Sequence, residues 1–229
     1  MVSEVIQSVR TLDAFAREHW QALQIGSEVT RWFRKDREPN VLNVTPENVI
    51  AALNAAGIVC VLMGTHGINV YRDQARATQD VDILVTKRDI RKAVRTLKES
   101  FPYLETAENS AVVRFIDPVT QKAVIDLMKP TSEGIRIAFR HAVAIGKSHR
   151  IPDLEMAIVS KFLAMIAPNR KQSKRLIDAG DLTNMVEHNR KSLDLEKLRR
   201  IGDKVQLHGG SKILKLVEEI DAGRPIQLQ

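Results

Sequence analysis

The sequence predicts an α/β (α+β) fold, in which a small mixed sheet with flanking helices is followed by a C-terminal helical domain. Strand character is found in a continuous apolar run at 58–63 and an alternating run at 79–85. Two further β-prone runs, 112–116 and 123–128, are separated by a turn and predict a hairpin. Residues 154–221 contain only helical periodicities, so we expect helix, then mixed sheet, then helices.

The composition is that of a globular protein. Of 229 residues, 44% are hydrophobic and 28% are charged, which leaves little room for disorder. No apolar run approaches the length that crosses a bilayer, and the first residues lack the basic start and apolar centre of a signal peptide. We therefore expect a cytoplasmic protein without membrane contact. The single cysteine, Cys60, lies in an apolar run and is expected to be buried.

The chain is basic, with a formal net charge of +7. This charge favours an acidic partner such as nucleic acid, although soluble enzymes can also be basic. Basic residues concentrate at 31–37, 87–95, 169–175 and 198–200. Each cluster also has the spacing of a solvated helix face, so the charge supports nucleic acid without establishing it.

The N-terminal part is predicted to be helical. Apolar residues recur with helical spacing over 3–33, and Thr45-Pro46 supplies an N-cap followed by proline at the first helical position. A helix over 46–56 is expected to end at Gly57. The predicted organisation is an N-terminal helical segment at 1–45, a core at 46–152 and a C-terminal helical domain at 153–229.

The core elements follow from local patterns. The apolar run at 58–63 predicts a buried strand, which residues 64–67 interrupt. Residues 68–76 are then expected to be helix or turn. After the alternating strand, Thr86 with Asp89 three residues later resembles a capping box and predicts the start of a helix.

Two carboxylates lie on the alternating strand. Residues two apart on a strand point to the same face, so Asp80 and Asp82 are expected to be side by side. Because like charges repel, a divalent cation with a preference for oxygen ligands, such as magnesium, is their natural partner. An exposed pair on an edge strand is the alternative, but Val81, Ile83 and Val85 indicate a central strand. We therefore predict a metal site.

Gly64-Thr65 stands at the end of the preceding buried strand. A junction of this kind directs free backbone N–H groups at an anion, and glycine lets a phosphate approach the backbone closely. An ordinary glycine turn is the alternative. The segment is neither a Walker A loop nor a three-glycine dinucleotide loop. Its position before the metal-binding strand favours a phosphate site.

The stretch GTHGINVYRDQARATQDVDILV resembles the signature of the DNA polymerase beta-like nucleotidyltransferase superfamily. In that signature, Gly-Gly or Gly-Ser precedes an Asp-hydrophobic-Asp-hydrophobic strand, and here Thr65 takes the second position. The resemblance implies a nucleotidyltransferase fold with a third carboxylate on a neighbouring strand, which Asp126 in AVIDLM fits. Asp117 competes for this role but precedes Pro118 and is better explained as a turn residue.

Within the superfamily, Arg76-x-Thr78-x-Asp80-x-Asp82 resembles AbiEii-type nucleotidyltransferases, the toxin components of some abortive-infection and toxin–antitoxin systems. The stretch IPDLEMAIVSKFLAMIAPNRKQSKRLIDAGDL is similar to their later motifs, with Lys161 on a helix followed by Asp178 and Asp181. The resemblance implies catalytic roles for Asp80, Asp82, Asp126 and Lys161, and nucleotide binding by Gly64, Thr65, Arg76, Thr78, Lys161 and Asp181.

The implied chemistry is transfer of a nucleoside monophosphate from a nucleoside triphosphate to an acceptor hydroxyl. Asp80 and Asp82 would bridge two Mg²⁺ ions, with Mn²⁺ as a substitute, and Asp126 would hold one of them and accept the proton of the acceptor. RNA, such as a tRNA end, is the favoured acceptor and a protein side chain is the other candidate. An antitoxin is a further candidate partner. The alternative is a catalytically silent fold that binds nucleic acid or a partner protein.

Simpler interpretations remain for several residues. Lys161 has the position of an ordinary surface lysine on an amphipathic helix. Asp178 and Asp181 share one helix face and could pair with Lys174 or Arg175. The histidines His66, His141 and His149 have no zinc-ligand spacing and are expected to be ordinary side chains.

Overall fold

The computed structural model describes residues 11–35 and 39–226, and these form a seven-stranded mixed sheet with helices around it. The strands are β1 (Cys60–Leu62), β2 (Val81–Val85), β3 (Glu105–Glu108), β4 (Val112–Ile116), β5 (Ala123–Met128), β6 (Ala142–Ile145) and β7 (His149–Pro152). Their order in the sheet is β3-β4-β5-β2-β1-β7-β6. The predicted fold class is confirmed.

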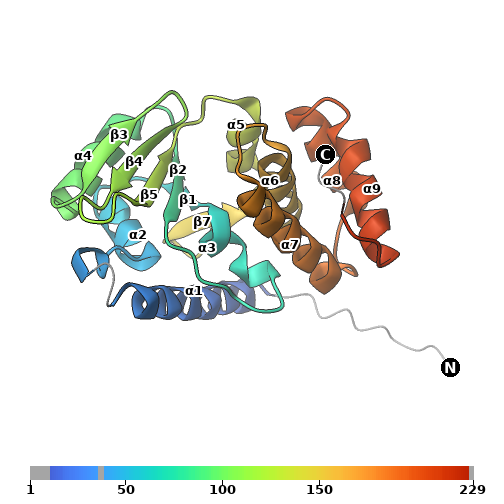
Figure 1. Cartoon of the computed structure of the whole chain (residues 1–229), viewed down its shortest axis with the longest axis horizontal. Helices are drawn as coiled ribbons and strands as arrows, with labels where there is room; N and C mark the ends of the chain where they lie inside the picture. Colours follow the sequence, from blue (N-terminus) through green and yellow to red (C-terminus); the bar gives the residue numbers. More distant parts are fainter. Residues whose placement is uncertain (1–10, 36–38, 227–229) are drawn as a thin grey trace.

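The helices surround this sheet and extend beyond it at the C-terminal end. They are α1 (Leu12–Arg34), α2 (Pro46–Ala55), α3 (Gly64–Ile68), α4 (Ile90–Ser100), α5 (Glu133–Arg140), α6 (Leu154–Ile166), α7 (Gln172–Asn189), α8 (Leu195–Val205) and α9 (Gly209–Asp221), with short 3₁₀ turns η1 (Pro39–Val41) and η2 (Asn69–Tyr71). Helices α2 and α4 lie on one side of the sheet, and α5, α6 and α7 lie on the other (Figure 1). No helix in the described ranges is both long and apolar enough to cross a membrane.

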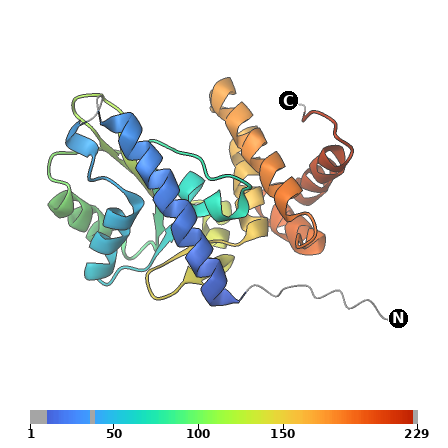
Figure 2. The same cartoon turned by 90° about the horizontal axis from the view of Figure 1, so that it is seen from below.

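Helix α1 lies across the core when the molecule is seen from below (Figure 2). It begins at Leu12, where the Thr11 side chain accepts a hydrogen bond from the Ala14 N–H, and residues 3–10 of the predicted helix lie outside the described residues. Its buried Arg34 donates to the carbonyls of Val41 and Val44 at 3.2 and 2.9 Å, and also to Gln79. The helix thus fixes the segment that leads into β2.

The predicted second helix is confirmed as α2. The Thr45 hydroxyl accepts a hydrogen bond from the Asn48 N–H at 3.3 Å, and Pro46 occupies the first helical position, where it loses no internal hydrogen bond. Gly57 follows the helix with φ +67°, a conformation that glycine adopts without strain.

Residues 64–67 interrupt the strand as expected and are themselves helical in α3. Residues 68–76, expected to be helix or turn, are helical as far as Tyr71 and continue without helix. One boundary in the core differs from the prediction. Strand β2 begins at Val81, so Asp80 precedes it. The reason is that side chains of α1 satisfy the backbone here: Thr30 donates to the Thr78 carbonyl at 2.8 Å and Arg34 to that of Gln79, in place of a neighbouring strand.

The hairpin of β4 and β5 is confirmed, and β5 pairs in parallel with β2. Asp117 is the buried turn residue that was expected, because its carboxylate accepts hydrogen bonds from the N–H groups of Val119 and Thr120. The sequence patterns did not predict β3, α5 or β6. Every residue of β3 is exposed, so no apolar alternation marks this edge strand.

The helical C-terminal tract is confirmed as α6 to α9. Asp153 caps α6 by accepting a hydrogen bond from the Met156 N–H at 2.9 Å. Helix α6 is buried along most of its length, and α7 packs against it. The division of the chain at residue 153 into two domains stays a prediction.

Candidate active site

Three aspartates meet at the centre of the sheet. Asp82 on β2 and Asp126 on β5 are paired in the parallel register, and Asp80 lies just before β2. One carboxylate oxygen from each lies within 4.8 Å of the others, and all three residues are partly buried. Sequence reasoning identified these three aspartates, and the structure brings them together.

Little positive charge compensates this cluster. Burial, together with the charges of Asp80 and Asp126, raises the pKa of the Asp82 carboxyl to about 8, and burial also raises the pKa of Asp126. The Nε of Arg114 lies 3.5 Å from Oδ1 of Asp126, and the Thr78 hydroxyl donates to Asp80 at 2.7 Å. Oδ1 of Asp126 is buried and accepts no hydrogen bond from the described residues. Oxygen ligands with this much uncompensated charge fit a divalent cation.

Gly64 is required at its position by Asp82. Its φ is +58°, and a Cβ atom added there would lie 1.9 Å from Oδ2 of Asp82. The expected approach of a phosphate to this backbone stays a prediction, whereas the space that a side chain at this position would need is taken by the carboxylate of Asp82. The glycine therefore makes room for a candidate metal ligand.

A pocket of about 360 Å³ opens beside the aspartates. The wall formed by the strands carries the three carboxylates and Arg114. The wall formed by the helices and the segment after η2 carries four cationic side chains and the carboxylate of Asp178; the cations are Arg76, Lys161, Arg170 and Lys174. Gly64, Thr65 and Thr78 also line it, so every predicted site residue except Asp181 borders the same pocket.

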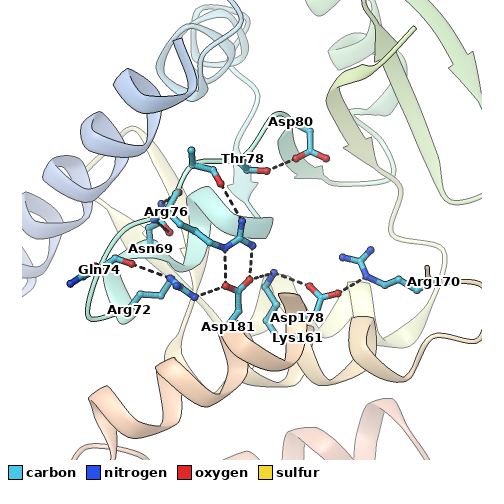
Figure 3. Close-up of polar contacts among 11 residues, drawn as sticks. Asn69, Arg72, Gln74, Arg76, Thr78, Asp80, Lys161, Arg170, Asp178 and Asp181 are labelled. Atoms are coloured by element: carbon cyan, nitrogen blue, oxygen red, sulfur yellow. Dashed lines mark hydrogen bonds and ion pairs between the residues drawn. The ribbon is translucent and has the colours of Figure 1, made fainter. Parts of the chain in front are cut away.

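Lys161 is buried, with 7% of its surface exposed, so the surface-lysine interpretation is wrong. Its Nζ lies 3.1 Å from Oδ1 of Asp178 and 2.7 Å from Oδ2 of Asp181 (Figure 3). Asp178 also accepts a hydrogen bond from Arg170. The two carboxylates therefore hold the Lys161 side chain in place.

Asp181 is the centre of a cationic cluster (Figure 3). It accepts two hydrogen bonds from the guanidinium of Arg76, at 2.8 and 2.6 Å, and pairs with Arg72 and Lys161. Burial alone would raise the pKa of its carboxyl, but the hydrogen bond from Arg76 and the charge of Lys161 outweigh burial and lower it. Asp181 therefore remains a carboxylate and holds cations beside the pocket.

The alternative in which Asp178 and Asp181 pair within their own helix is wrong, because their ion-pair partners in the described structure, Arg72, Arg76, Lys161 and Arg170, come from outside α7. Their face of α7 is turned toward α6 and the segment after η2, while Nε of Arg175 donates to the carbonyl of Met165 at 2.6 Å. Sequence reasoning also missed Arg72, Arg114 and Arg170. The hairpin register gave a signal only for Arg114, which lies opposite Asp126.

The segment after η2 is fixed on both sides, which places Arg76. The side chain of Asn69 bonds both backbone groups of Arg76, at 3.0 and 3.3 Å. From α7, Asn184 accepts a hydrogen bond from the Asp73 N–H and Asn189 donates to the Tyr71 carbonyl. Arg76 thus reaches the pocket from a segment anchored to the C-terminal helices.

The histidines form no metal site in the described part of the chain, where the three aspartates are the one group able to offer three ligands. Nε2 of His19 and Nε2 of His149 are 3.0 Å apart, and burial lowers their pKa values to about 3 and about 4. Burial also lowers the pKa of His66 to about 4. These side chains are neutral and pack in the interior.

No family model and no curated protein matches the sequence. Solved structures show a distant similarity. An antigenic nucleotidyltransferase-like protein from Paracoccidioides brasiliensis is 16% identical, with a TM-score of 0.43 over 77% of this chain and 90% of the other. The antibiotic-resistance factor ANT(2'')-Ia is 12% identical, with a TM-score of 0.46 over 77% and 92%. Terminal uridylyl transferase 4 from Trypanosoma brucei is 14% identical, with a TM-score of 0.33 over 86% and 72%. The chemistry of this chain is therefore inferred from its own side chains.

Proposed function

We propose that this chain is a metal-dependent nucleotidyltransferase that moves a nucleoside monophosphate from a nucleoside triphosphate to an acceptor hydroxyl and releases pyrophosphate. The observation that carries the proposal is the division of one pocket into two walls of opposite charge. A triphosphate with bound metal ions also has two parts of opposite charge, the cations and the phosphate oxygens. The ions match the carboxylate wall, and the phosphate oxygens match the cationic wall.

Asp80, Asp82 and Asp126 would hold the metal, for which we propose two Mg²⁺ ions, with Mn²⁺ as a substitute. The set fits, because it offers only oxygen ligands and includes the buried Oδ1 of Asp126, which has no hydrogen bond in the described structure. When bound, magnesium neutralises charge on the phosphates and lowers the pKa of the attacking hydroxyl.

The carboxylates have distinct supports that suit distinct roles. Asp82 is fixed by the backbone of β2 and by the absence of a side chain at Gly64. The hydroxyl of Thr78 donates to Asp80 at 2.7 Å and orients that carboxylate. Burial raises the pKa values of both Asp82 and Asp126, so each is a stronger base than an exposed carboxylate. We propose that Asp126 accepts the proton of the acceptor hydroxyl.

The cationic wall would hold the triphosphate. Arg76, Lys161 and Arg170 line the pocket, and Asp178 and Asp181 neutralise them in the structure. Phosphate oxygens could replace Asp178 or Asp181 as partners of these cations without a large movement of the cationic side chains. Asp181 does not border the pocket, so we propose that it serves the nucleotide by positioning Arg76 and Lys161. Gly64 and Thr65 are proposed to contact the phosphates beside Asp82.

RNA is the acceptor that we propose. Lys87, Arg91 and Lys92 at the start of α4 are exposed, and none has an ion pair with another described residue. Lys171 and Lys174, before and within α7, are also exposed. Exposed cations of this kind suit phosphate contacts and agree with the net charge of +7.

Only sequence resemblance supports a toxin role and an antitoxin partner, through Arg76-x-Thr78-x-Asp80-x-Asp82 and the later motifs at 151–182. We propose that expression of the intact chain arrests bacterial growth and that Asp82→Asn relieves the arrest. Equal growth arrest by both proteins would contradict a toxic activity that depends on catalysis.

The test of the function is incubation of the protein with each labelled nucleoside triphosphate, Mg²⁺ and total cellular RNA. We expect label on RNA, and no label with Asp82→Asn. Label found only on protein would contradict the RNA acceptor and indicate a protein acceptor. No label with any of the triphosphates would favour the silent binding module.

A further inference from the structure

A second cavity lies at the opposite end of β2 from Asp80. Strands β2 and β5 are parallel neighbours, and the chain leaves β2 toward α4 on one side of the sheet and β5 toward α5 on the other (Figure 1). Where adjacent parallel strands continue to opposite sides, a crevice opens at their carboxyl ends, and such crevices commonly bind ligands in α/β sheets. This cavity has a volume of about 570 Å³ and is lined by Thr86, Lys87, Ile90, Lys129, Pro130, Thr131, Arg136 and Phe139.

The cavity is separate from the aspartate pocket, because no lining residue is shared. Along β2, Thr86 follows Asp82 by four residues, and along β5, Lys129 follows Asp126 by three. At about 3.3 Å per strand residue, the cavity begins about 10 to 13 Å from the carboxylates. A molecule bound there would not contact a metal held by the aspartates.

The lining combines positive charge with apolar surface. Lys87, Lys129 and Arg136 are cationic, and none of the described lining residues is acidic. Lys129 is paired with Glu108 at 2.5 Å and Arg136 with Glu133 at 2.9 Å, both outside the lining. Lys87 is exposed and forms no ion pair within the described chain. One free cation and two partly satisfied ones therefore face the cavity.

The apolar part of the lining comes from the other side chains. Ile90 at the start of α4 and Phe139 on α5 are partly exposed and also pack against the core, and Pro130 adds a third apolar surface. These apolar side chains, one from α4 and one from α5, offer a place for a flat group in a cavity that Lys87, Lys129 and Arg136 also line. Small-molecule sites have this combination of apolar walls and few polar anchors.

We propose that this cavity binds a small organic anion whose phosphate or carboxylate contacts Lys87 and Arg136 and whose flat apolar part packs between Ile90 and Phe139. A volume of about 570 Å³ accommodates a molecule the size of a mononucleotide. Binding requires no metal, and Lys87 is the one lining residue that the cavity shares with the surface proposed for RNA.

The test is an NMR titration of the uniformly ¹⁵N-labelled full chain with adenosine 5′-monophosphate in EDTA. We expect saturable shifts at the amides of Thr86, Lys87 and Thr131, and inorganic phosphate should bind at least about tenfold more weakly, because it lacks the apolar part. Shifts confined to Gly64 and Thr65, equal affinity for phosphate, or no saturable shifts at millimolar concentration would each overturn the proposal.

A pair of double variants makes the test specific. Lys87→Ala with Arg136→Ala should weaken binding by about tenfold or more, equivalent to about 1.4 kcal/mol. The matched control is Lys212→Ala with Arg199→Ala, because Lys212 is exposed and Arg199 pairs with Glu196 three residues earlier, as Arg136 does with Glu133. Asp82→Asn should leave this binding unchanged. Equal loss in both double variants, or retention of affinity in the first, would contradict the assignment.

Discussion

The two walls of the aspartate pocket differ in how their charge is balanced. The carboxylate wall is carried by strands, and Arg114, at 3.5 Å from Asp126, is its one close cation among the described residues. The cationic wall is carried by helices and an anchored segment, and Asp178 and Asp181 already neutralise it. The first wall therefore depends on an external cation, whereas the second can exchange its internal carboxylates for a ligand.

This difference has an energetic consequence. Clustering three partly buried carboxylates is unfavourable, as the raised pKa values of Asp82 and Asp126 indicate, so a bound cation should stabilise the fold. On the other wall, Arg76, Lys161 and Arg170 already pair with Asp178 or Asp181. Removing Asp178 or Asp181 should therefore act mainly by displacing the side chains that these carboxylates hold.

The largest effect is expected for Asp82→Asn, which removes one charge from the carboxylate wall. Transfer should fall by about 10²- to 10³-fold or more, the scale of losing one electrostatic contact to a transition state. Thermal unfolding in EDTA should not shift to lower temperature, because the substitution relieves repulsion. Steady-state rates measure the loss of transfer, and calorimetry measures the unfolding temperature. Near-wild-type turnover would show that Asp82 is not a catalytic residue.

Gly64→Ala should damage the same wall through sterics. The added Cβ would meet Asp82 at 1.9 Å in a backbone conformation with φ +58°, so we expect a loss of about 1–3 kcal/mol in unfolding free energy together with loss of activity. Gly180→Ala on α7 is the matched control, because its Cβ meets nothing within 4 Å and should not destabilise the helix. Equal stability of the two variants would show that the contact at Gly64 is relaxed.

On the cationic wall, Asp181→Asn should act on nucleotide binding. Arg76 and Lys161 would lose their shared carboxylate, and we expect KM for the triphosphate to rise by about tenfold with a smaller change in kcat. The control is Asp221→Asn, which breaks an exposed pair in which Arg190 Nε donates to both carboxylate oxygens, and it should leave KM unchanged. A purely structural role for Asp181 would lower stability without this change in KM.

The smallest effect concerns the acceptor. Replacing exposed Lys171 and Lys174 by Ala should reduce the salt dependence of RNA binding by up to about two units, one per phosphate contact. Arg175 is left intact, because its hydrogen bond to the Met165 carbonyl has a structural role. Fluorescence anisotropy at several salt concentrations measures the slope. An unchanged slope would show that these lysines do not contact RNA phosphates.

Local patterns and a family resemblance together predicted the carboxylate wall. Alternation along a strand predicted that Asp80 and Asp82 lie side by side, whereas Asp126 was predicted only because the sequence resembles nucleotidyltransferases. Local periodicity also predicted the mixed sheet and the C-terminal helices. Strand β3 could not be found, since an exposed edge strand leaves no apolar pattern.

The cationic wall could not be predicted in the same way. The contacts of Lys161 with Asp178 and Asp181, and of Asp181 with Arg72 and Arg76, depend on how α6, α7 and the segment after η2 pack. Helical spacing alone offered Asp178 and Asp181 partners on their own helix, Lys174 or Arg175. The burial of Lys161 could not be predicted either, because lysines are usually exposed and its partners lie on another helix.

The most direct test of the two-wall account is calorimetric titration of Mn²⁺ into the protein, with thermal unfolding followed in parallel. The wild-type protein should bind Mn²⁺ and unfold at a higher temperature as the ion is added, while Asp82→Asn should lose both effects and Asp181→Asn should retain them. Absence of Mn²⁺ binding by the wild-type protein, or equal binding by Asp82→Asn, would contradict the assignment of the carboxylate wall as the metal site.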